Sequence, residues 1–328
     1  MKTKYYIRAL IPLCVIAAVF RVFEIFFAIE SDTGFYVQFS PIPLIFNIFS
    51  ALSVLFFLSV LVIFPKEKKP IVSRFAKITV SEKIAIALSA VCIFVSSCNT
   101  FFTAMFPSGI SAIFNTLIYS EGRFLVPAED NYIIAADLKA SLIGIPMLML
   151  ISAIFIVIFT IYYIKRPARA EMGLFFKLIS VFFTIYYVAR LFVASGDSSA
   201  ILSRAYTSYR ILFLCSVVLF FMNFSKMLIG VTSKKFMIAF GTYAVFFGAI
   251  RFSEFVITLL PNNPHNIDND IFSYIADFTT IAAIVSMLIR ITIRRRRKRP
   301  EISDVEPEKT SPVLIGDDED VINNERMI

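Results

Sequence analysis

Eight apolar stretches run through the chain, and Lys and Arg gather in every second gap between them. Each stretch is close to the length of about 20 mostly apolar residues that an α-helix needs to cross a bilayer. The pattern predicts an all-α, polytopic transmembrane helical bundle, with the spans paired as four helical hairpins. We expect these spans at residues 9–29, 42–64, 84–106, 141–164, 172–195, 210–230, 236–260 and 271–293.

Composition leaves little room for anything besides this bundle. The chain of 328 residues is 58% hydrophobic, and its mean hydropathy is +0.78. Soluble domains are typically about 45–50% apolar. Only residues 107–140 and the tail from residue 294 onward are long enough to add further structure, so a sizeable soluble domain is excluded.

The charged residues between the spans predict the orientation of the chain. Basic residues precede the first span and fill the gaps after the second, fourth, sixth and eighth spans, whereas the other gaps carry mainly acidic residues. Positively charged loops are retained in the cytoplasm. We therefore expect a multi-pass protein of the plasma membrane with both termini cytoplasmic. The net charge of +8 then reflects loops that face a lipid bilayer, and no nucleic acid partner is expected.

Two segments outside the spans have a composition of their own. The run Arg294, Arg295, Arg296, Arg297, Lys298 and Arg299 follows the last span. It is typical of a stop-transfer anchor, and contact with anionic lipid is an alternative. Residues 300–328 are rich in acids and contain no aromatic residue, so we expect a disordered cytoplasmic tail. Residues 107–140 contain an amphipathic stretch, which favours a helix that lies on the membrane or re-enters it.

Strong polar side chains recur in the predicted outer halves of the spans. An Arg-x-x-Glu motif occurs in the first span and again in the seventh, and residues three apart share one face of a helix. The predicted inner halves carry few such groups. The candidate site consists of Arg21, Glu24, Asn47, Asn99, Arg190, Arg251, Glu254 and Asp277.

The cost of burial constrains this cluster. One ionisable side chain at the bilayer centre costs about 2.5–3.5 kcal/mol. Six would cost at most roughly 15–20 kcal/mol, which exceeds a typical total stability of about 5–15 kcal/mol. The charges must therefore pair with one another across helices, or they must line a polar cavity that is open to the outside. Both hypotheses fit the sequence.

Motifs for catalysis are weak. Asp32-Thr33-Gly34 matches the short triplet of aspartic proteases, but it occurs once, and a carboxylate dyad needs two copies. His265 is the only histidine, which argues against a His-rich zinc site. All four cysteines lie inside predicted spans. We expect no catalytic residue, metal site or cofactor, so an enzyme is disfavoured.

The Arg-x-x-Glu helix that runs into Asp32-Thr33-Gly34-Phe35-Tyr36 resembles a feature of multi-pass membrane proteins from low-GC Gram-positive bacteria. The bias toward Phe, Ile and Lys is similar to theirs as well. The resemblance covers about a tenth of the chain. It implies a membrane location and no activity.

These patterns favour a non-enzymatic integral membrane protein whose outer polar cluster binds a small ligand or holds the bundle together. One alternative is a transporter or permease subunit. Gly241 and Gly248 interrupt the seventh span, as in the broken helices of transporters, whereas the other spans look continuous. A second alternative is a membrane sensor or assembly partner that uses its basic loops and acidic tail to contact another protein.

Overall fold

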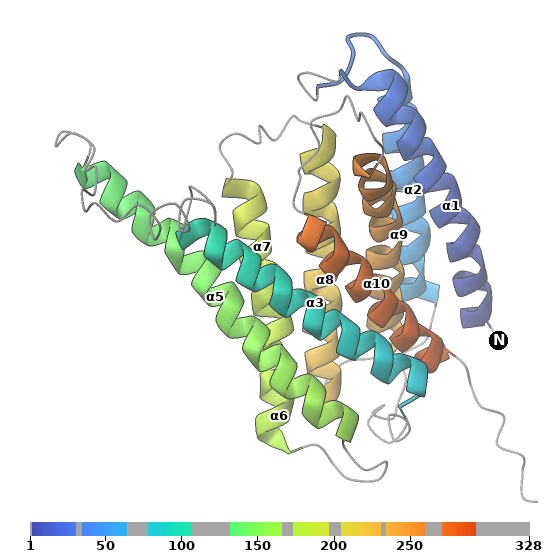
Figure 1. The fold of residues 1–328 in the computed structure, drawn as a ribbon. Coiled ribbons are helices and arrows are strands. Elements are labelled where there is room, and N and C mark those ends of the chain that lie inside the picture. The colour runs from blue at the N-terminus through green and yellow to red at the C-terminus, as the bar shows by residue number, and fades with distance from the viewer. Residues whose placement is uncertain are drawn as a thin grey trace, which may run out of the picture. The chain divides into compact units, whose positions relative to one another are not determined.

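A computed structural model describes residues 2–30, 35–63, 78–105, 132–165, 173–196, 205–230, 234–259 and 271–292 (Figure 1). Within these ranges nearly every residue is helical. The helices are α1 (Lys2–Ala28), α2 (Ile42–Ile63), α3 (Val80–Met105), α5 (Tyr132–Lys165), α6 (Leu174–Ile179), α7 (Val181–Gly196), α8 (Ala205–Ile229), α9 (Lys234–Thr258) and α10 (Ile271–Thr292).

Eight membrane-length segments are found among the described residues, with α6 and α7 together forming one of them. Each segment is long and apolar enough to cross a bilayer. The prediction of an all-α polytopic bundle is therefore confirmed. The Asp32-Thr33-Gly34 triplet, residues 107–131, the basic run 294–299 and the tail 300–328 lie outside the described residues.

Several helices begin earlier than the hydropathy pattern indicates. Helix α1 begins at Lys2, α3 at Val80, α5 at Tyr132 and α8 at Ala205. At the start of α3, the hydroxyl oxygen of Thr79 accepts a hydrogen bond of 3.3 Å from the backbone N–H of Glu82. This contact is half of a Thr-x-x-Glu capping box, which stabilises a first turn that is too polar to register as part of a span.

The fifth predicted span, at 172–195, corresponds to α6 and α7, which together form one membrane-length segment with a turn at Ser180. The hydroxyl of Ser180 donates a 2.6 Å hydrogen bond to the carbonyl of Lys177, and helix α6 ends there. Such back-bonding by serine tends to bend helices. Ser180 keeps α-helical dihedral angles, with φ −59° and ψ −19°. Ser180 is therefore not the unwound segment that is typical of transporter sites.

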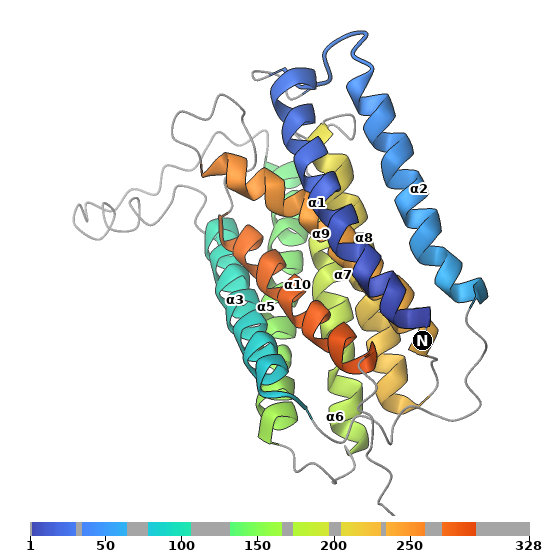
Figure 2. The same cartoon turned by 90° about the vertical axis from the view of Figure 1, so that its right-hand side faces the viewer.

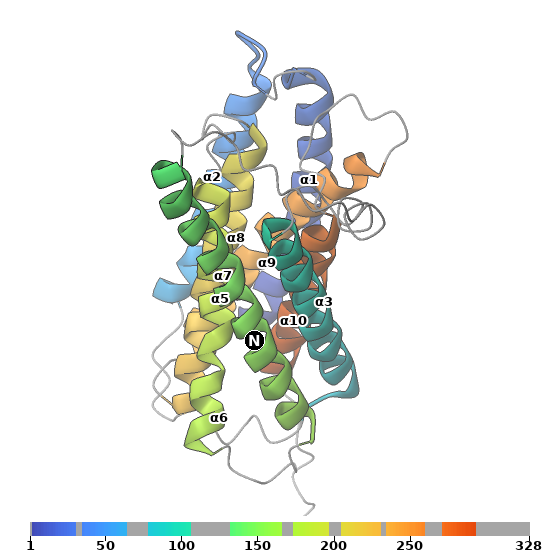
Figure 3. The same cartoon turned by 60° about the vertical axis from the view of Figure 1, so that its left-hand side comes forward.

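Six helices form a closed ring of neighbours, in the order α3, α5, α7, α8, α9, α10 and back to α3. Figure 3 shows α5 and α3 on one face of this arrangement. Helices α1 and α2 pack on α9, and α1 passes in front of α9 in Figure 2. Helix α9 is therefore covered on several sides, and its charged residues Arg251 and Glu254 are buried.

Gly241 and Gly248 do not interrupt α9, which is continuous from Lys234 to Thr258. They allow α10 to approach closely. A Cβ atom added at Gly248 would lie 2.3 Å from Cδ1 of Ile281, and one added at Gly241 would lie 2.7 Å from Cδ2 of Leu288. Small residues at contacts between membrane helices permit this kind of close packing. The glycines therefore do not support a broken-helix transporter.

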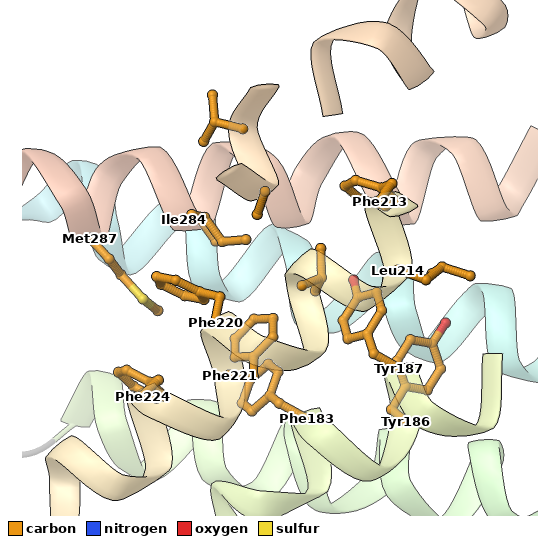
Figure 4. Close-up of a cluster of buried hydrophobic side chains, with 14 of the residues drawn as sticks. Phe183, Tyr186, Tyr187, Phe213, Leu214, Phe220, Phe221, Phe224, Ile284 and Met287 are labelled. Atoms are coloured by element: carbon orange, nitrogen blue, oxygen red, sulfur yellow. The ribbon is translucent and has the colours of Figure 1, made fainter. Parts of the chain in front are cut away.

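An aromatic layer fills the middle of the ring (Figure 4). The rings of Phe183 on α7 and Phe221 on α8 stack with their centroids 4.6 Å apart. Phe159 on α5 meets Phe183 edge-on at 5.8 Å and Phe224 at 6.3 Å. All four side chains are buried. Their contacts join α5, α7 and α8 in an apolar layer inside the bundle.

Candidate functional site

Six buried charges form one chain of alternating sign across four helices. Every member has a side chain that is at most 3% exposed. Three are arginines and three are acids, so the chain is neutral when all six are ionised. In order of contact the members are Glu24, Arg21, Glu254, Arg251, Asp277 and Arg190.

The first half of the chain joins α1 to α9. Arg21 donates from Nη1 to Glu24 at 2.7 Å within its own helix. It also donates to Oε1 of Glu254 on α9, from Nη2 at 2.5 Å and from Nε at 3.1 Å. Both of these donors reach one carboxylate oxygen, and hydrogen bonds between charged groups are roughly twice as strong as those between neutral groups. The two Arg-x-x-Glu motifs are thus bonded to each other.

Arg251 occupies the middle of the chain and is incompletely satisfied. Its Nη1 donates to Oε2 of Glu254 at 2.9 Å and to the hydroxyl of Tyr274 at 2.9 Å. Its guanidinium carbon lies 3.9 Å from the centroid of the Tyr274 ring. Nε approaches Oδ2 of Asp277 only to 3.9 Å. Among the described residues, neither Nε nor Nη2 of Arg251 has a hydrogen-bond acceptor.

The last two members of the chain join α7 to α10 across the ring. Both terminal nitrogens of Arg190 donate to Asp277, Nη1 to Oδ1 and Nη2 to Oδ2 at 3.2 Å. The guanidinium carbon of Arg190 lies 5.9 Å from the ring centroid of Tyr186 and 5.8 Å from that of Tyr187. Asp277 is the acid that holds Arg190 within the described residues.

Polar and aromatic groups cover the α1 end of the chain. Arg21 lies over the ring of Tyr209, 4.5 Å from its centroid, and the Tyr209 hydroxyl donates to Oδ1 of Asn47 at 2.8 Å. Tyr36 is held near Glu24 by backbone pairing with the end of α1, in which Val37 N–H donates to the carbonyl of Ala28 at 2.9 Å. Burial raises the pKa of the Tyr36 phenol, and the Glu24 carboxylate raises that pKa further.

Seven of the eight candidate residues are therefore brought together, six as ion pairs and Asn47 through Tyr209. Asn99 is half-buried on α3, and its described contact is made by its backbone, which accepts a 2.8 Å bond from the Thr103 hydroxyl. The structure does not link Asn99 to the chain of charges.

A second buried charge cluster lies at the opposite end of the bundle, and sequence reasoning missed it. Arg290 on α10 donates from Nη2 to Glu82 on α3 at 3.0 Å and to the hydroxyl of Tyr163 on α5 at 3.1 Å. The Tyr163 hydroxyl donates to the same carboxylate oxygen at 3.2 Å. Glu82 and Arg290 stand near span ends, where charges usually reach the headgroups. The Thr79-x-x-Glu82 capping pattern was the available signal.

Hydroxyl groups continue from this second cluster along the contact between α3 and α10. The polar residues on this face of α3 are spaced seven apart, as Glu82, Ser89 and Ser96. Ser89 bonds Thr280 at 2.9 Å, and Ser96 bonds Ser273 at 3.5 Å. Thr280 also accepts from the hydroxyl of Tyr187 at 2.6 Å. Such pairs join membrane helices without a charge.

The chemistry available at the site is recognition by charge and hydrogen bonding. Among the described residues no three His, Cys, Asp or Glu side chains are grouped to hold a metal ion. Among the three arginines of this set of six charges, Arg251 has two buried nitrogens, Nε and Nη2, without an acceptor among the described residues. No family model, curated protein or solved structure matches this chain.

Proposed function

We propose that this protein is an integral membrane protein that binds a small polar solute inside its bundle, at the end predicted to face outside. The observation that carries the proposal is Arg251, a residue 2% exposed with two donors that no described residue accepts. An unsatisfied buried donor costs about 1–3 kcal/mol, and more when it is charged. A solute that supplies an acceptor would remove that cost.

Ion pairing alone does not account for this arrangement. A chain built only to hold the helices together would place an acceptor at each donor of its arginines, as Arg21 does with all three of its nitrogens. Intramembrane charges are also a functional hypothesis by default. The pairing keeps the site neutral and folded, and the open edge of Arg251 supports binding.

The proposal is tested by thermal unfolding of the purified protein in detergent with a panel of amino acids, sugars, amines and organic acids. A solute at 100 times its Kd stabilises the folded state by about 2.7 kcal/mol. We expect at least one class of solute to raise the melting temperature. Arg251→Leu should abolish this shift, and Arg8→Leu, at an exposed position on α1, should retain it. A panel with no stabilising solute would refute solute binding.

Transport is a second candidate, and the order of layers along the bundle favours it. Asp277 and Arg290 lie 13 positions apart on α10, or about 20 Å at 1.5 Å per residue. The buried Ile284 and Met287 stand between them on α10. Buried apolar residues thus separate the polar site from the second ion pair. A polar site with such a layer on its inner side suits alternating access. Uptake of a stabilising solute into proteoliposomes would support transport, and binding without uptake would exclude it.

The proposed location is the bacterial plasma membrane with both termini in the cytoplasm. The charge asymmetry of the loops supports it. A cysteine in place of Phe39, which is 94% exposed, should react with an impermeant thiol reagent on intact cells. A reporter fused after Arg299 should report cytoplasm. Labelling of Phe39→Cys only after lysis would reverse the orientation.

A further inference from the structure

The two unfilled donors of Arg251 lie on the same edge of its guanidinium group. Nε–H and the outer N–H of Nη2 point the same way, and this edge binds a carboxylate through two parallel hydrogen bonds. The opposite nitrogen, Nη1, is already occupied by Glu254 and Tyr274. The open edge therefore fits a planar anion with two oxygens better than it fits a single hydroxyl or an amine.

Charge balance limits how such an anion can enter. Three arginines and three acids make the chain neutral, and all six side chains are at most 3% exposed. An additional negative charge in this setting would be uncompensated, and unpaired buried charges are strongly disfavoured. The anion must therefore arrive with one compensating positive charge, which a proton can supply.

The geometry also indicates where that proton would reside. Oδ2 of Asp277 is 3.9 Å from Nε of Arg251, so a carboxylate in the open edge would lie beside the carboxylate of Asp277. Two carboxylates that share a site cannot both remain ionised easily, and one of them takes a proton. Protonated Asp277 would keep one acceptor oxygen for Arg190 and donate its O–H to the bound carboxylate.

The groups that face Asp277 are consistent with a proton on this carboxyl group when a carboxylate is bound. Arg190, Tyr186 and Tyr187 approach from α7, and Arg251 approaches from α9. On the α3 side, the described neighbours of this part of α10 are hydroxyl groups, such as Ser96 at Ser273. Asp277 is thus the acid adjacent to the open edge, because Glu254 is bound by Arg21 and Arg251 together.

We propose that the solute is a small carboxylate, held by Nε and Nη2 of Arg251 and taken up together with one proton that resides on Asp277. This inference rests on the proposed function and names the ligand class of the same site. The balanced step is the binding of one carboxylate anion and one proton from water, which leaves the net charge of the buried site unchanged. Release of the carboxylate returns the proton to water.

The test measures binding of benzoate, acetate and succinate by calorimetry between pH 6 and pH 8, with benzamide and acetamide as neutral controls. We expect a carboxylate to bind and its matched amide to fail. The apparent Kd should increase about tenfold for each unit by which the pH rises, as linkage requires when one proton is taken up with the anion. Measurements in two buffers with different heats of ionisation should give an uptake of one proton per anion in the wild-type protein.

Two variants separate this site from a general effect on folding. Arg251→Lys keeps the positive charge and loses the two parallel donors of the guanidinium. Glu254 keeps Arg21 as a partner and Asp277 keeps Arg190, so this variant should fold. It should bind the carboxylate at least about tenfold more weakly than the wild-type protein does. Arg8→Lys is the matched control and should bind normally. Asp277→Asn leaves one net positive charge, so the anion should bind without proton uptake and with no dependence on pH.

Each result bears on the proposal. Binding of the amide as tightly as the carboxylate, or carboxylate binding without proton uptake in the wild type, would overturn it. Stabilisation by sugars or amines with no carboxylate bound would overturn the carboxylate assignment and leave the proposed function intact. The absence of binding by every class of solute would defeat both.

Discussion

Replacement of Asp277 by Leu should destabilise the bundle more than replacement of Glu254 by Leu. Each change removes one acid and leaves the buried site with one net positive charge. Glu254 lies between two arginines that have other acids, since Arg21 keeps Glu24 and Arg251 can approach Asp277 from its present 3.9 Å. Loss of Asp277 removes the acid that both terminal nitrogens of Arg190 contact.

The size of the effect follows from the burial of Arg190, which is 3% exposed. The loss of one partner from a buried ion pair costs about 3–5 kcal/mol. The Tyr186 and Tyr187 rings, whose centroids lie 5.9 Å and 5.8 Å from the Arg190 guanidinium carbon, offset about 0.5–2 kcal/mol at most. We expect Asp277→Leu to lower the free energy of unfolding by about 1–4.5 kcal/mol after that offset.

A double-mutant cycle in detergent measures this directly. Arg190→Leu combined with Asp277→Leu leaves Glu24, Arg21, Glu254 and Arg251 as a neutral chain, so the double variant should recover most of the stability that Asp277→Leu loses. The readout is the thermal or denaturant midpoint by circular dichroism. Equal losses for Asp277→Leu and Glu254→Leu, or a double variant no more stable than Asp277→Leu, would refute the reasoning.

Three further changes test other parts of the fold by the same melting assay. Gly248→Ala should cost about 1–3 kcal/mol from overpacking against α10, whereas Gly144→Ala, with nothing within 4 Å of its new Cβ, should be neutral or stabilise by up to about 1 kcal/mol; equal effects would contradict the close approach of α9 and α10. Arg290→Leu should destabilise by leaving Glu82 without its arginine, and addition of Glu82→Leu should restore stability; a double variant as unstable as Arg290→Leu would argue against the pair. Deletion of residues 301–328 should leave the midpoint unchanged, because an acidic segment of this composition buries little, and a lower midpoint would show that the tail docks.

The spans could be predicted from the sequence because a bilayer imposes one length and one composition on each helix. Helix ends were less accurate. Val80 begins α3 four residues before the predicted position, since the capping contact at Thr79 adds a polar first turn. The division between α6 and α7 at Ser180 could not be predicted, because a single hydroxyl bonded to Lys177 leaves the hydropathy of the span unaltered.

Part of the site could be predicted as well. The spacing of Arg21 and Glu24 placed them on one face, and they do pair within their helix. The partners across helices could not be predicted, because they depend on which helices are neighbours and how each is rotated. Nothing in the order of residues indicates that Arg21 reaches Glu254 or that Arg190 reaches Asp277. Glu82 and Arg290 were missed because burial near a span end and extension to the headgroups look alike in sequence.

Pairing and solute binding were opposed hypotheses at the level of sequence, and the structure removes that opposition. A neutral chain of three arginines and three acids can be buried in a membrane bundle because its charges satisfy one another. The same neutrality would make the proposed site selective, since any ion that enters would have to bring a counter-charge or a proton with it. Only an arginine with an open edge can accept such a ligand without breaking an existing pair, and among the members of the chain that the structure describes, Arg251 has Nε and Nη2 both without an acceptor. The ion pairs therefore join α1, α7, α9 and α10, and the incomplete satisfaction of Arg251 is the reason that we propose solute binding between α9 and α10.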